Sequence, residues 1–299
     1  MWESSKVCKA DMKVCSICNS KDLTFVRHSK SKFGLFNNLK IFKCQKCSFQ
    51  FINSAFDKKS IQNFYKSNHY ADCINNSNKF FFENIAKSRF DFIKSNISFR
   101  KNYSILEVGA GDGFLLKEFI SEGKNTNLSA IEYNEESIQK LKELNIQVFS
   151  DISKIHKKSR YDLIILSHVL EHVLDQNTFL VKLNALLNKN GYIFVDVPCL
   201  DYLLKNDTGS HISFFDLFSL NYFFKKRNFD DVAAYYCGPN FFILRFTKSF
   251  KIYLFLMNML YIFTYNFTKH KVSRLSFIWS LNSYSKFKRM WIRAIYRKL

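Results

Sequence analysis

The chain contains very little proline and glycine and lacks a long, purely apolar segment. Only 2 of its 299 residues are Pro and 8 are Gly, which excludes collagen-like and proline-rich low-complexity proteins. The longest run without a charged residue, residues 252–268, is 17 residues long and includes two asparagines, whereas a membrane-spanning helix needs about 20 mostly apolar residues. The first residues enter charged sequence without the apolar core of a secretory signal. We therefore expect a cytoplasmic protein.

Acidic residues are scarce relative to basic ones. The 45 Lys and Arg residues exceed the 25 Asp and Glu residues and give a formal net charge of +20. Such an excess favours an anionic partner, namely phosphate, nucleic acid or an acidic membrane surface. A composition rich in lysine and asparagine is also typical of AT-rich genomes, so compositional drift is an alternative source of this charge.

The last sixth of the chain, residues 249–299, contains ten basic residues and no acidic one. Within it, residues 286–298 carry Trp291 and Ile295 on one helical face and basic side chains opposite. This pattern predicts C-terminal helices, the last of which lies on an anionic membrane face. A phosphate-rich ligand, an RNA, or packing of a terminal helix on the core would suit the same residues.

Four of the eight cysteines form two C-x2-C pairs, Cys15 with Cys18 and Cys44 with Cys47. Two such knuckles supply the four thiolates that a structural Zn²⁺ ion prefers, and a closed four-sulfur shell leaves no position for catalysis. The surrounding segment is too small for a core of its own, so bound metal would stabilise its fold. We predict a zinc ribbon over residues 1–60, with a redox pair as the alternative.

A pattern of alternating strands and helices occupies the centre of the chain. It predicts a doubly wound α/β domain over residues 104–248, with ligands at the carboxyl ends of its parallel strands. The preceding residues 61–103 are expected to form helices with aromatic stripes, in which Tyr65, His69 and Tyr70 are candidates for a cleft. The expected strands are 104–108, 128–132, 146–149, 161–167 and 191–197, and the expected helices include 114–121 and 176–188.

A glycine-rich turn follows the first expected strand of this domain. Its sequence is Glu107-Val108-Gly109-Ala110-Gly111-Asp112-Gly113, which differs from the G-x-G-x-x-G turn of dinucleotide-binding proteins. The carboxylates at positions 107 and 112 would repel a pyrophosphate but suit a cationic or zwitterionic ligand. Glu132 ends the next strand, at about the interval where nucleotide folds have an acid on the ribose hydroxyls. S-adenosylmethionine, with a sulfonium, an amino-acid end and a ribose, fits these residues.

The chain resembles class I S-adenosylmethionine-dependent methyltransferases. The resemblance rests on the turn, on Glu132 and on the segment Tyr161-Asp162-Leu163-Ile164-Ile165-Leu166-Ser167-His168-Val169-Leu170-Glu171-His172-Val173. The cysteine array and the later segment His211-Ile212-Ser213-Phe214-Phe215 are similar to a zinc-bearing subgroup, which includes deoxysugar C-methyltransferases and methyltransferases of surface-polysaccharide clusters. Those C-methyltransferases carry a further C-terminal α/β domain, which we do not expect in a chain of this length.

The resemblance implies a seven-stranded Rossmann-like sheet and a set of cofactor contacts. Glu132 would accept hydrogen bonds from the ribose hydroxyls, and Asp151 would meet the adenine amino group. Ser167 and His168 would line the floor of the site. Helix capping is the alternative role for Asp151 and Ser167. The cofactor turn itself would comprise Glu107, Gly109, Ala110, Gly111 and Gly113.

Three histidines lie just beyond expected strand ends, where an acceptor would enter. Methylation of a hydroxyl or a C–H acid requires removal of a proton, and histidine suits that role near neutral pH. We favour His211 as the general base, followed by His172, for which a structural hydrogen bond is the alternative. His168 would share a helical face with His172. Cys199 resembles the nucleophile of cytosine C5 methyltransferases but follows a different strand.

These observations lead to one hypothesis and two alternatives. We expect methyl transfer from S-adenosylmethionine to a small-molecule acceptor, a sugar hydroxyl or carbon in cell-surface glycan synthesis, on a nucleotide- or lipid-linked substrate. One alternative is an RNA methyltransferase, because zinc ribbons and basic tails also occur in that group. The other is a non-catalytic scaffold tethered to a membrane. In the first case peripheral attachment to the inner membrane face would act through the basic tail.

Overall fold

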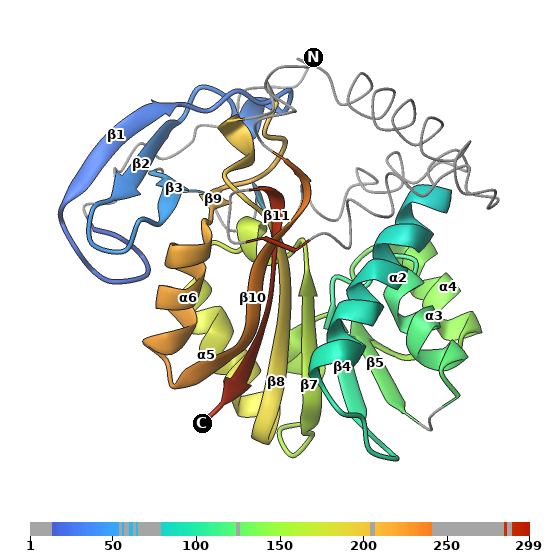
Figure 1. The fold of residues 1–299 in the computed structure, drawn as a ribbon. Coiled ribbons are helices and arrows are strands. Elements are labelled where there is room, and N and C mark those ends of the chain that lie inside the picture. The colour runs from blue at the N-terminus through green and yellow to red at the C-terminus, as the bar shows by residue number, and fades with distance from the viewer. Residues whose placement is uncertain are drawn as a thin grey trace, which may run out of the picture.

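The computed structural model describes residues 14–53, 56, 60–61, 64, 79–123, 126–203, 207–240, 284–285 and 289–299. These residues form a large sheet with helices on both faces, beside a smaller sheet built mainly from the N-terminal segment (Figure 1). Tyr65, His69 and Tyr70 lie outside the described residues, as do residues 249–283 with the uncharged run and much of the basic tail.

Seven strands in the order β10-β11-β8-β7-β4-β5-β6 form the large sheet, so the predicted α/β fold is confirmed. Strands β4 to β8 are parallel, while β11 and β10 add antiparallel strands at one edge. The strands are β4 (Ser104–Val108), β5 (Asn127–Ile131), β6 (Gln147–Phe149), β7 (Tyr161–Ser167), β8 (Leu187–Pro198), β10 (Phe229–Asn240) and β11 (Arg289–Lys298).

Alternate residues of the central strands face opposite helical layers. In β7, Leu163 and Ile165 belong to one buried cluster, and Ile164 and Leu166 belong to the other. Both faces of the strand are therefore buried, which explains its unbroken apolar sequence. The first layer contains α2 (Lys79–Asn96), α3 (Phe114–Ser121) and α4 (Glu135–Glu143), and the second contains α5 (Gln176–Leu186) and α6 (Leu217–Lys225) (Figure 1).

Three of these helices begin at side-chain caps. Asn134 accepts a hydrogen bond from the backbone N–H of Ser137 at the start of α4, and Asp175 caps α5 in the same way. Asp216 and Ser219 form a reciprocal capping box at the start of α6. Each cap satisfies backbone donors that the first helical turn leaves unpaired, which stops these helices from extending into the preceding loops.

The smaller sheet joins the N-terminal segment to the α/β domain. Its order is β1-β2-β3-β9, with β1 (Leu23–His28), β2 (Lys40–Cys44) and β3 (Gln50–Ile52) from the cysteine-bearing segment. The fourth strand, β9 (Ser213–Phe214), comes from the α/β domain and pairs antiparallel with β3. The two parts of the chain therefore share a hydrogen-bonded sheet.

The expected amphipathic helix at the C-terminus is wrong. Residues Arg289–Lys298 form strand β11, which lies between β8 and β10 and is buried along most of its length. The boundary at residue 248 is corrected as well, because β11 belongs to the same sheet as residues 104–240. In the described part of the chain, no helix has the length and apolarity to cross a membrane.

A buried ion-pair network explains why a basic residue can occupy the middle of β11. The Arg293 side chain is fully buried, and its Nε lies 3.0 Å from Asp196 Oδ2 on β8. Arg89 on α2 approaches the same oxygen at 2.7 Å. Although burial opposes ionisation, these arginines lower the pKa of Asp196 to about 2. Arg293, one of the basic residues expected on the polar face of a helix, is therefore a buried cation inside the sheet.

Replacing Arg293 by Met should destabilise the fold, because Asp196 would lose one of its two buried cationic partners. We expect a loss of about 3–5 kcal/mol in the free energy of unfolding, measured by urea denaturation at pH 7. Arg297→Met, at the exposed end of the same strand, should cost less than about 0.5 kcal/mol. Equal stability of the two variants would contradict the network.

The same variant should show a pH dependence. The folded-state pKa of Asp196 lies below its ordinary value of 3.8, so its ion pairs stabilise the fold above about pH 4 and lose their effect as pH falls toward 2. The difference in stability between Arg293→Met and the parent chain should therefore shrink in that acid window.

Candidate functional site

The glycine turn follows the carboxyl end of β4, the end of the strands at which parallel α/β sheets bind their ligands. Gly109 and Gly111 have φ angles of +67° and +52°, in the left-handed region that favours glycine. A Cβ atom at Gly111 would meet nothing within 4 Å, so the backbone is open on this side. A Cβ at Gly113 would instead lie 2.7 Å from Leu141, which shows that this glycine is needed for packing of α4.

Glu107 is the penultimate residue of β4, next to the turn, and carries a buried oxygen without a partner among the described residues. Its side chain is almost fully buried, and Oε2 has no hydrogen-bond donor among the described residues. Burial raises the pKa of Glu107 to about 8, partly opposed by Arg89 and reinforced by Glu132. A carboxyl group of this kind fits a cationic or N–H-bearing ligand, which would supply the missing donor.

Glu132 and Asp112 differ in what holds them. The Glu132 carboxylate accepts hydrogen bonds from the backbone N–H groups of Gly111, Tyr133 and Asn134, which fixes it at the carboxyl end of β5. Oε1 accepts two of these bonds, whereas Oε2 accepts only the one from Gly111 and keeps a second lone pair for a ligand hydroxyl. Asp112 instead contacts Ser137 and Lys140 on α4, so its carboxylate anchors the turn to the helix.

The remaining predicted cofactor residues lie along the same edge of the sheet. Asp151 follows β6 and caps the short 3₁₀ helix η3 (Ile152–Lys154) through Ser153, as the capping alternative anticipated. Ser167 ends β7 with a buried hydroxyl that has no partner among the described residues. His168 follows with a φ angle of +54°, and its backbone N–H donates to the carbonyl of Asp196.

A buried carboxylate that the sequence reasoning missed brings the histidines together. Glu171 lies in the 3₁₀ helix η4 (Leu170–His172), and its Oε1 is 3.0 Å from His168 Nδ1 and 3.9 Å from His172 Nε2. Burial disfavours the charged form, but these histidines lower the pKa of Glu171 below its ordinary value. The position of Glu171 between the two histidines of the H-V-L-E-H segment could have indicated this contact from the sequence.

A second missed carboxylate holds His211. Asp201, in the 3₁₀ helix η5 (Asp201–Leu203), has Oδ2 at 2.8 Å from His211 Nδ1, and its side chain is buried. The rings of His211 and His172 pack edge to face at 4.9 Å between centroids. Burial lowers the pKa of His172 to about 4, with a smaller opposing effect of Glu171. His172 is therefore neutral at pH 7, and its Nδ1 lies 3.3 Å from the Ser210 carbonyl.

The cysteine-bearing segment holds the His211 loop from the other side. The backbone N–H of Ile52 on β3 donates to the carbonyl of Ile212, and the N–H of Ile212 donates to the carbonyl of Glu171. Thr208 in the same loop donates to the carbonyl of Lys30. His211 is thus fixed between the smaller sheet and η4.

The four cysteines of the two C-x2-C pairs meet in one buried cluster. Their sulfur atoms lie within 4.8 Å of one another, with Sγ–Sγ distances of 3.6 Å between Cys15 and Cys47 and 3.4 Å between Cys18 and Cys44. A tetrahedral site with metal–sulfur bonds of ~2.3 Å has sulfur–sulfur edges of ~3.8 Å, so only small adjustments are needed. The donor set and geometry therefore fit a closed structural metal site.

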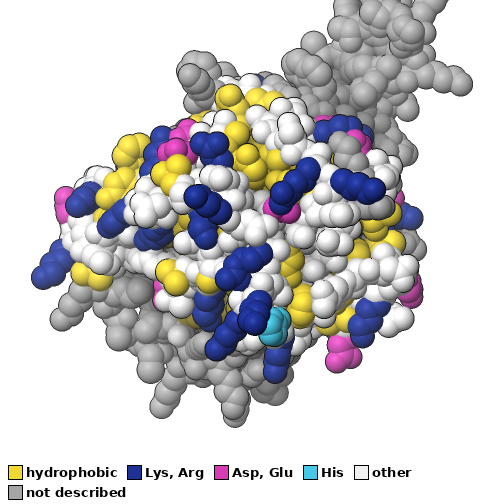
Figure 2. All heavy atoms as spheres, turned by 90° about the horizontal axis from the view of Figure 1, so that it is seen from below, with side chains coloured by type: hydrophobic (Ala, Val, Ile, Leu, Met, Phe, Trp, Pro, Cys, Tyr) yellow, Lys and Arg dark blue, Asp and Glu magenta, His cyan; other side chains and the backbone are white. Residues whose placement is uncertain are grey.

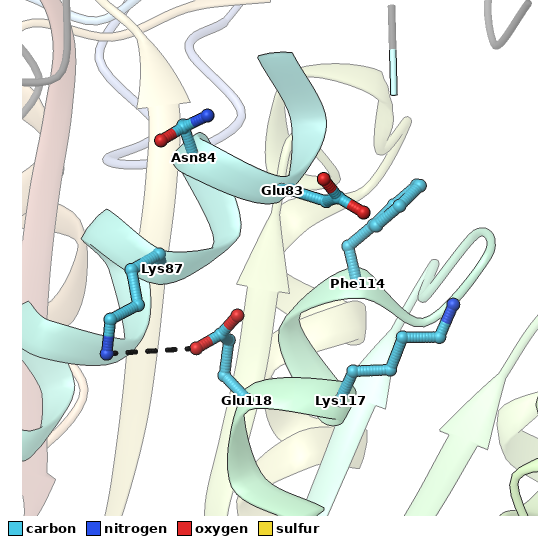
Figure 3. A pocket seen from close by; sticks show the side chains of 6 residues that line it. All are labelled: Glu83, Asn84, Lys87, Phe114, Lys117 and Glu118. Atoms are coloured by element: carbon cyan, nitrogen blue, oxygen red, sulfur yellow. Dashed lines mark ion pairs between the residues drawn. The ribbon is translucent and has the colours of Figure 1, made fainter. Parts of the chain in front are cut away.

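A groove of about 430 Å³ lies between α2 and α3, next to the glycine turn. Figure 3 shows its lining side chains, with Lys87 on α2 facing Glu118 on α3 at 3.8 Å. Lys117 lies over the ring of Phe114. The charges of the groove are matched across it, and its lining includes neither the histidines nor the cysteines of the site.

The cysteine cluster predicts one tightly bound metal ion per chain. Cys47→Ser should remove that ion and destabilise the smaller sheet, because a bound metal would join the loops next to β1, β2 and β3. Cys237→Ser, which changes a buried cysteine outside the cluster, should retain the ion. Metal analysis of the purified proteins measures both outcomes, and a metal-free parent chain with an intact fold would contradict the assignment.

Comparisons with known proteins agree with this geometry. A family model described as a methyltransferase domain matches residues 81–234, just over half of the chain. The (S)-tetrahydroprotoberberine N-methyltransferase of Eschscholzia californica is 27% identical over 101 residues, which cover 31% of this chain and 29% of that protein. The ubiquinone biosynthesis O-methyltransferase of Rickettsia felis is 28% identical over 152 residues, covering 48% and 62%.

Among solved structures, coclaurine N-methyltransferase bound to N-methylheliamine and SAH has a TM-score of 0.48 and 16% identity, covering 71% of this chain and 72% of that one. A SAM-dependent methyltransferase from Archaeoglobus fulgidus has a TM-score of 0.48 and 18% identity, covering 72% and 94%. The chain spans about a third of the length of the plant relatives that it matches in sequence. With the family model covering more than half of its residues, the chain belongs to the methyltransferase domain family.

Proposed function

We propose that this protein transfers a methyl group from S-adenosylmethionine to a small-molecule acceptor, a sugar hydroxyl or carbon in cell-surface glycan synthesis. The observation that carries the proposal is the buried, unpartnered Glu107 oxygen beneath an open glycine turn. When bound, S-adenosylmethionine supplies a methyl group activated by a sulfonium. Family membership supports this donor, and the acceptor is inferred separately.

The residues around the turn suit the parts of this donor. Glu107 would accept a hydrogen bond from the amino group of its methionine end, and Glu132 would accept from the ribose hydroxyls. Asp151, just beyond the end of β6, would contact the adenine amino group, and Ser167, at the end of β7, would line the floor of the site. His168 would line the floor of the site beside Glu171.

His211 is the better candidate for the general base. Asp201 lies against Nδ1 and would hold the proton there, so that Nε2 can accept a proton from the acceptor. The lowered pKa makes His172 a weak base, although its ring packs against that of His211 and helps to orient it. This division of roles follows the pattern in which a carboxylate orients a catalytic imidazole.

Two lines of reasoning support a small acceptor. One relative is named as a tetrahydroprotoberberine N-methyltransferase and another as an O-methyltransferase of ubiquinone biosynthesis. Tetrahydroprotoberberine and ubiquinone are both small molecules. The sugar assignment rests on the cysteine pairs and the His211–Phe215 segment, which resemble sugar methyltransferases. The metal proposed for the cysteine cluster is Zn²⁺, with a structural role.

The state of Glu107 predicts that binding of the donor releases a proton. In the free protein its pKa of about 8 keeps most of the carboxyl groups protonated at pH 7, and a nearby cation would lower that pKa. Affinity for S-adenosylmethionine should therefore rise between pH 6 and about 8 and then level off. Calorimetry at pH 7 in buffers of different ionisation enthalpy measures the release.

Glu107→Gln should abolish both the proton release and the pH dependence. Glu135→Gln, an exposed carboxyl at the start of nearby α4, should retain both. Binding that releases no proton in the parent chain would refute the assigned contact.

His211→Ala should lower kcat by about 10²–10⁴-fold, because the acceptor would lose its general base. Affinity for S-adenosylmethionine should stay unchanged, since His211 is assigned to the acceptor. Asp201→Asn should also lower kcat and shift its pH profile, whereas His172→Ala should cost less than His211→Ala. Release of S-adenosylhomocysteine provides the assay, with His156→Ala at an exposed loop as the control. Full turnover of His211→Ala would exclude the base assignment.

A further inference from the structure

The glycine turn lies at the carboxyl ends of the parallel strands. The amino ends of the same strands form the opposite edge of the sheet. Basic side chains project from the loops and strand ends at this edge, and Figure 2 shows Lys and Arg spread across the middle of the face seen from below Figure 1. We call this surface the basic face. Its exposed members are Lys101, Lys157, Lys158, Arg160, Lys189 and Arg297.

Strand pairing brings these residues together although they are far apart in sequence. Lys101 precedes β4, residues 157–160 precede β7, and Lys189 lies near the start of β8. The end of antiparallel β11 returns to the same edge, where Arg297 pairs with Tyr192. Since neighbouring strands are about 4.8 Å apart, four adjacent strands spread these charges over a surface on the order of 15 Å wide.

The positive charges of the basic face are only slightly neutralised. Asp162 lies at this edge but is buried, and it already pairs with Arg100. Asp231 pairs with Lys225. Lys298 shows the crowding directly, because burial and the nearby Arg160 lower its pKa. Arg297 lies opposite the exposed Asp230 in the β10–β11 pairing, so the positive charge of the basic face rests mainly on Lys101, Lys157, Lys158, Arg160 and Lys189.

We propose that the basic face binds an anionic lipid bilayer. A bilayer offers a plane of negative charge, and each Lys or Arg near such a plane contributes about 1 kcal/mol of attraction. A face made of loops at one sheet edge matches a planar array of anions. The described residues of this face include no exposed Phe, Tyr or Trp, and the exposed His156 beside Lys157 offers a single ring, which gives single-stranded RNA little to stack on.

The position of the basic face also argues against a nucleic-acid substrate. It lies at the opposite end of the strands from Glu107 and the histidines, so the part of a polyanion held there would be away from the proposed methyl-transfer site. A bilayer bound there would leave that site facing the solution, open to a soluble acceptor. This surface differs from the expected C-terminal helix, whose residues 289–298 form β11.

Sedimentation of the full chain with vesicles tests the proposal. The chain should bind vesicles made of equal amounts of phosphatidylcholine and phosphatidylglycerol, and high salt should release it from them. It should not bind vesicles of phosphatidylcholine alone. Lys157→Glu with Lys158→Glu should weaken binding about tenfold or more. Lys101→Glu with Lys189→Glu should weaken it similarly, which provides a second variant if the first folds poorly.

Lys30→Glu with Lys40→Glu provides a control of equal charge change in the smaller sheet region, and it should bind like the parent chain. Equal binding of the parent to neutral and anionic vesicles would overturn the proposal. The same conclusion would follow if both basic-face variants bound like the control. Displacement from the vesicles by single-stranded RNA at equal phosphate concentration would assign the face to nucleic acid instead.

Discussion

The pairing of β9 with β3 is the constraint on which the acceptor side of this protein depends. Strand β9 belongs to the α/β domain in sequence, yet its hydrogen bonds join it to the cysteine-bearing segment. Because β9 begins two residues after His211, the register of this pairing also fixes the histidine. A metal in the cysteine cluster would thus act at a distance, by holding the sheet that positions the proposed base, without contacting the reacting atoms. This coupling gives a physical reason for combining a ribbon of this kind with a methyltransferase domain.

Two buried carboxyl groups of the large sheet, Glu107 and Asp196, differ in the charges around them. Glu107 is buried with an oxygen that has no partner among the described residues, and burial raises its pKa to about 8. Asp196 is equally buried but has two arginines against it, and its pKa falls to about 2. Glu107 is therefore suited to bind a cation, whereas Asp196 links α2, β8 and β11 through its ion pairs. Burial alone therefore does not predict the state of a carboxyl group, and the nearest charges decide it.

Local patterns predicted the centre of the fold well, because they depend on short-range physics. The strand 161–167 and the helix 114–121 have the predicted bounds, since their apolar runs end at a turn and a helix start. The C-terminal strand could not be predicted in this way. In the sequence, Arg293 is typical of a surface residue, because its partner Asp196 is 97 residues away and the pairing is visible only in the fold. Likewise Asp201 could not be linked to His211 from sequence, because the contact joins two loops that only the folded structure brings together.

The central claim is that the glycine turn presents S-adenosylmethionine to a small acceptor held at the His211 side of the same edge. Incubation of the full chain with S-adenosylmethionine labelled in its methyl group, together with nucleotide sugars, a lipid extract and total RNA, tests this claim directly. The account predicts label in the sugar fraction, with none in RNA. Label confined to RNA would contradict the acceptor assignment, and failure to bind the donor at all would contradict the proposed activity.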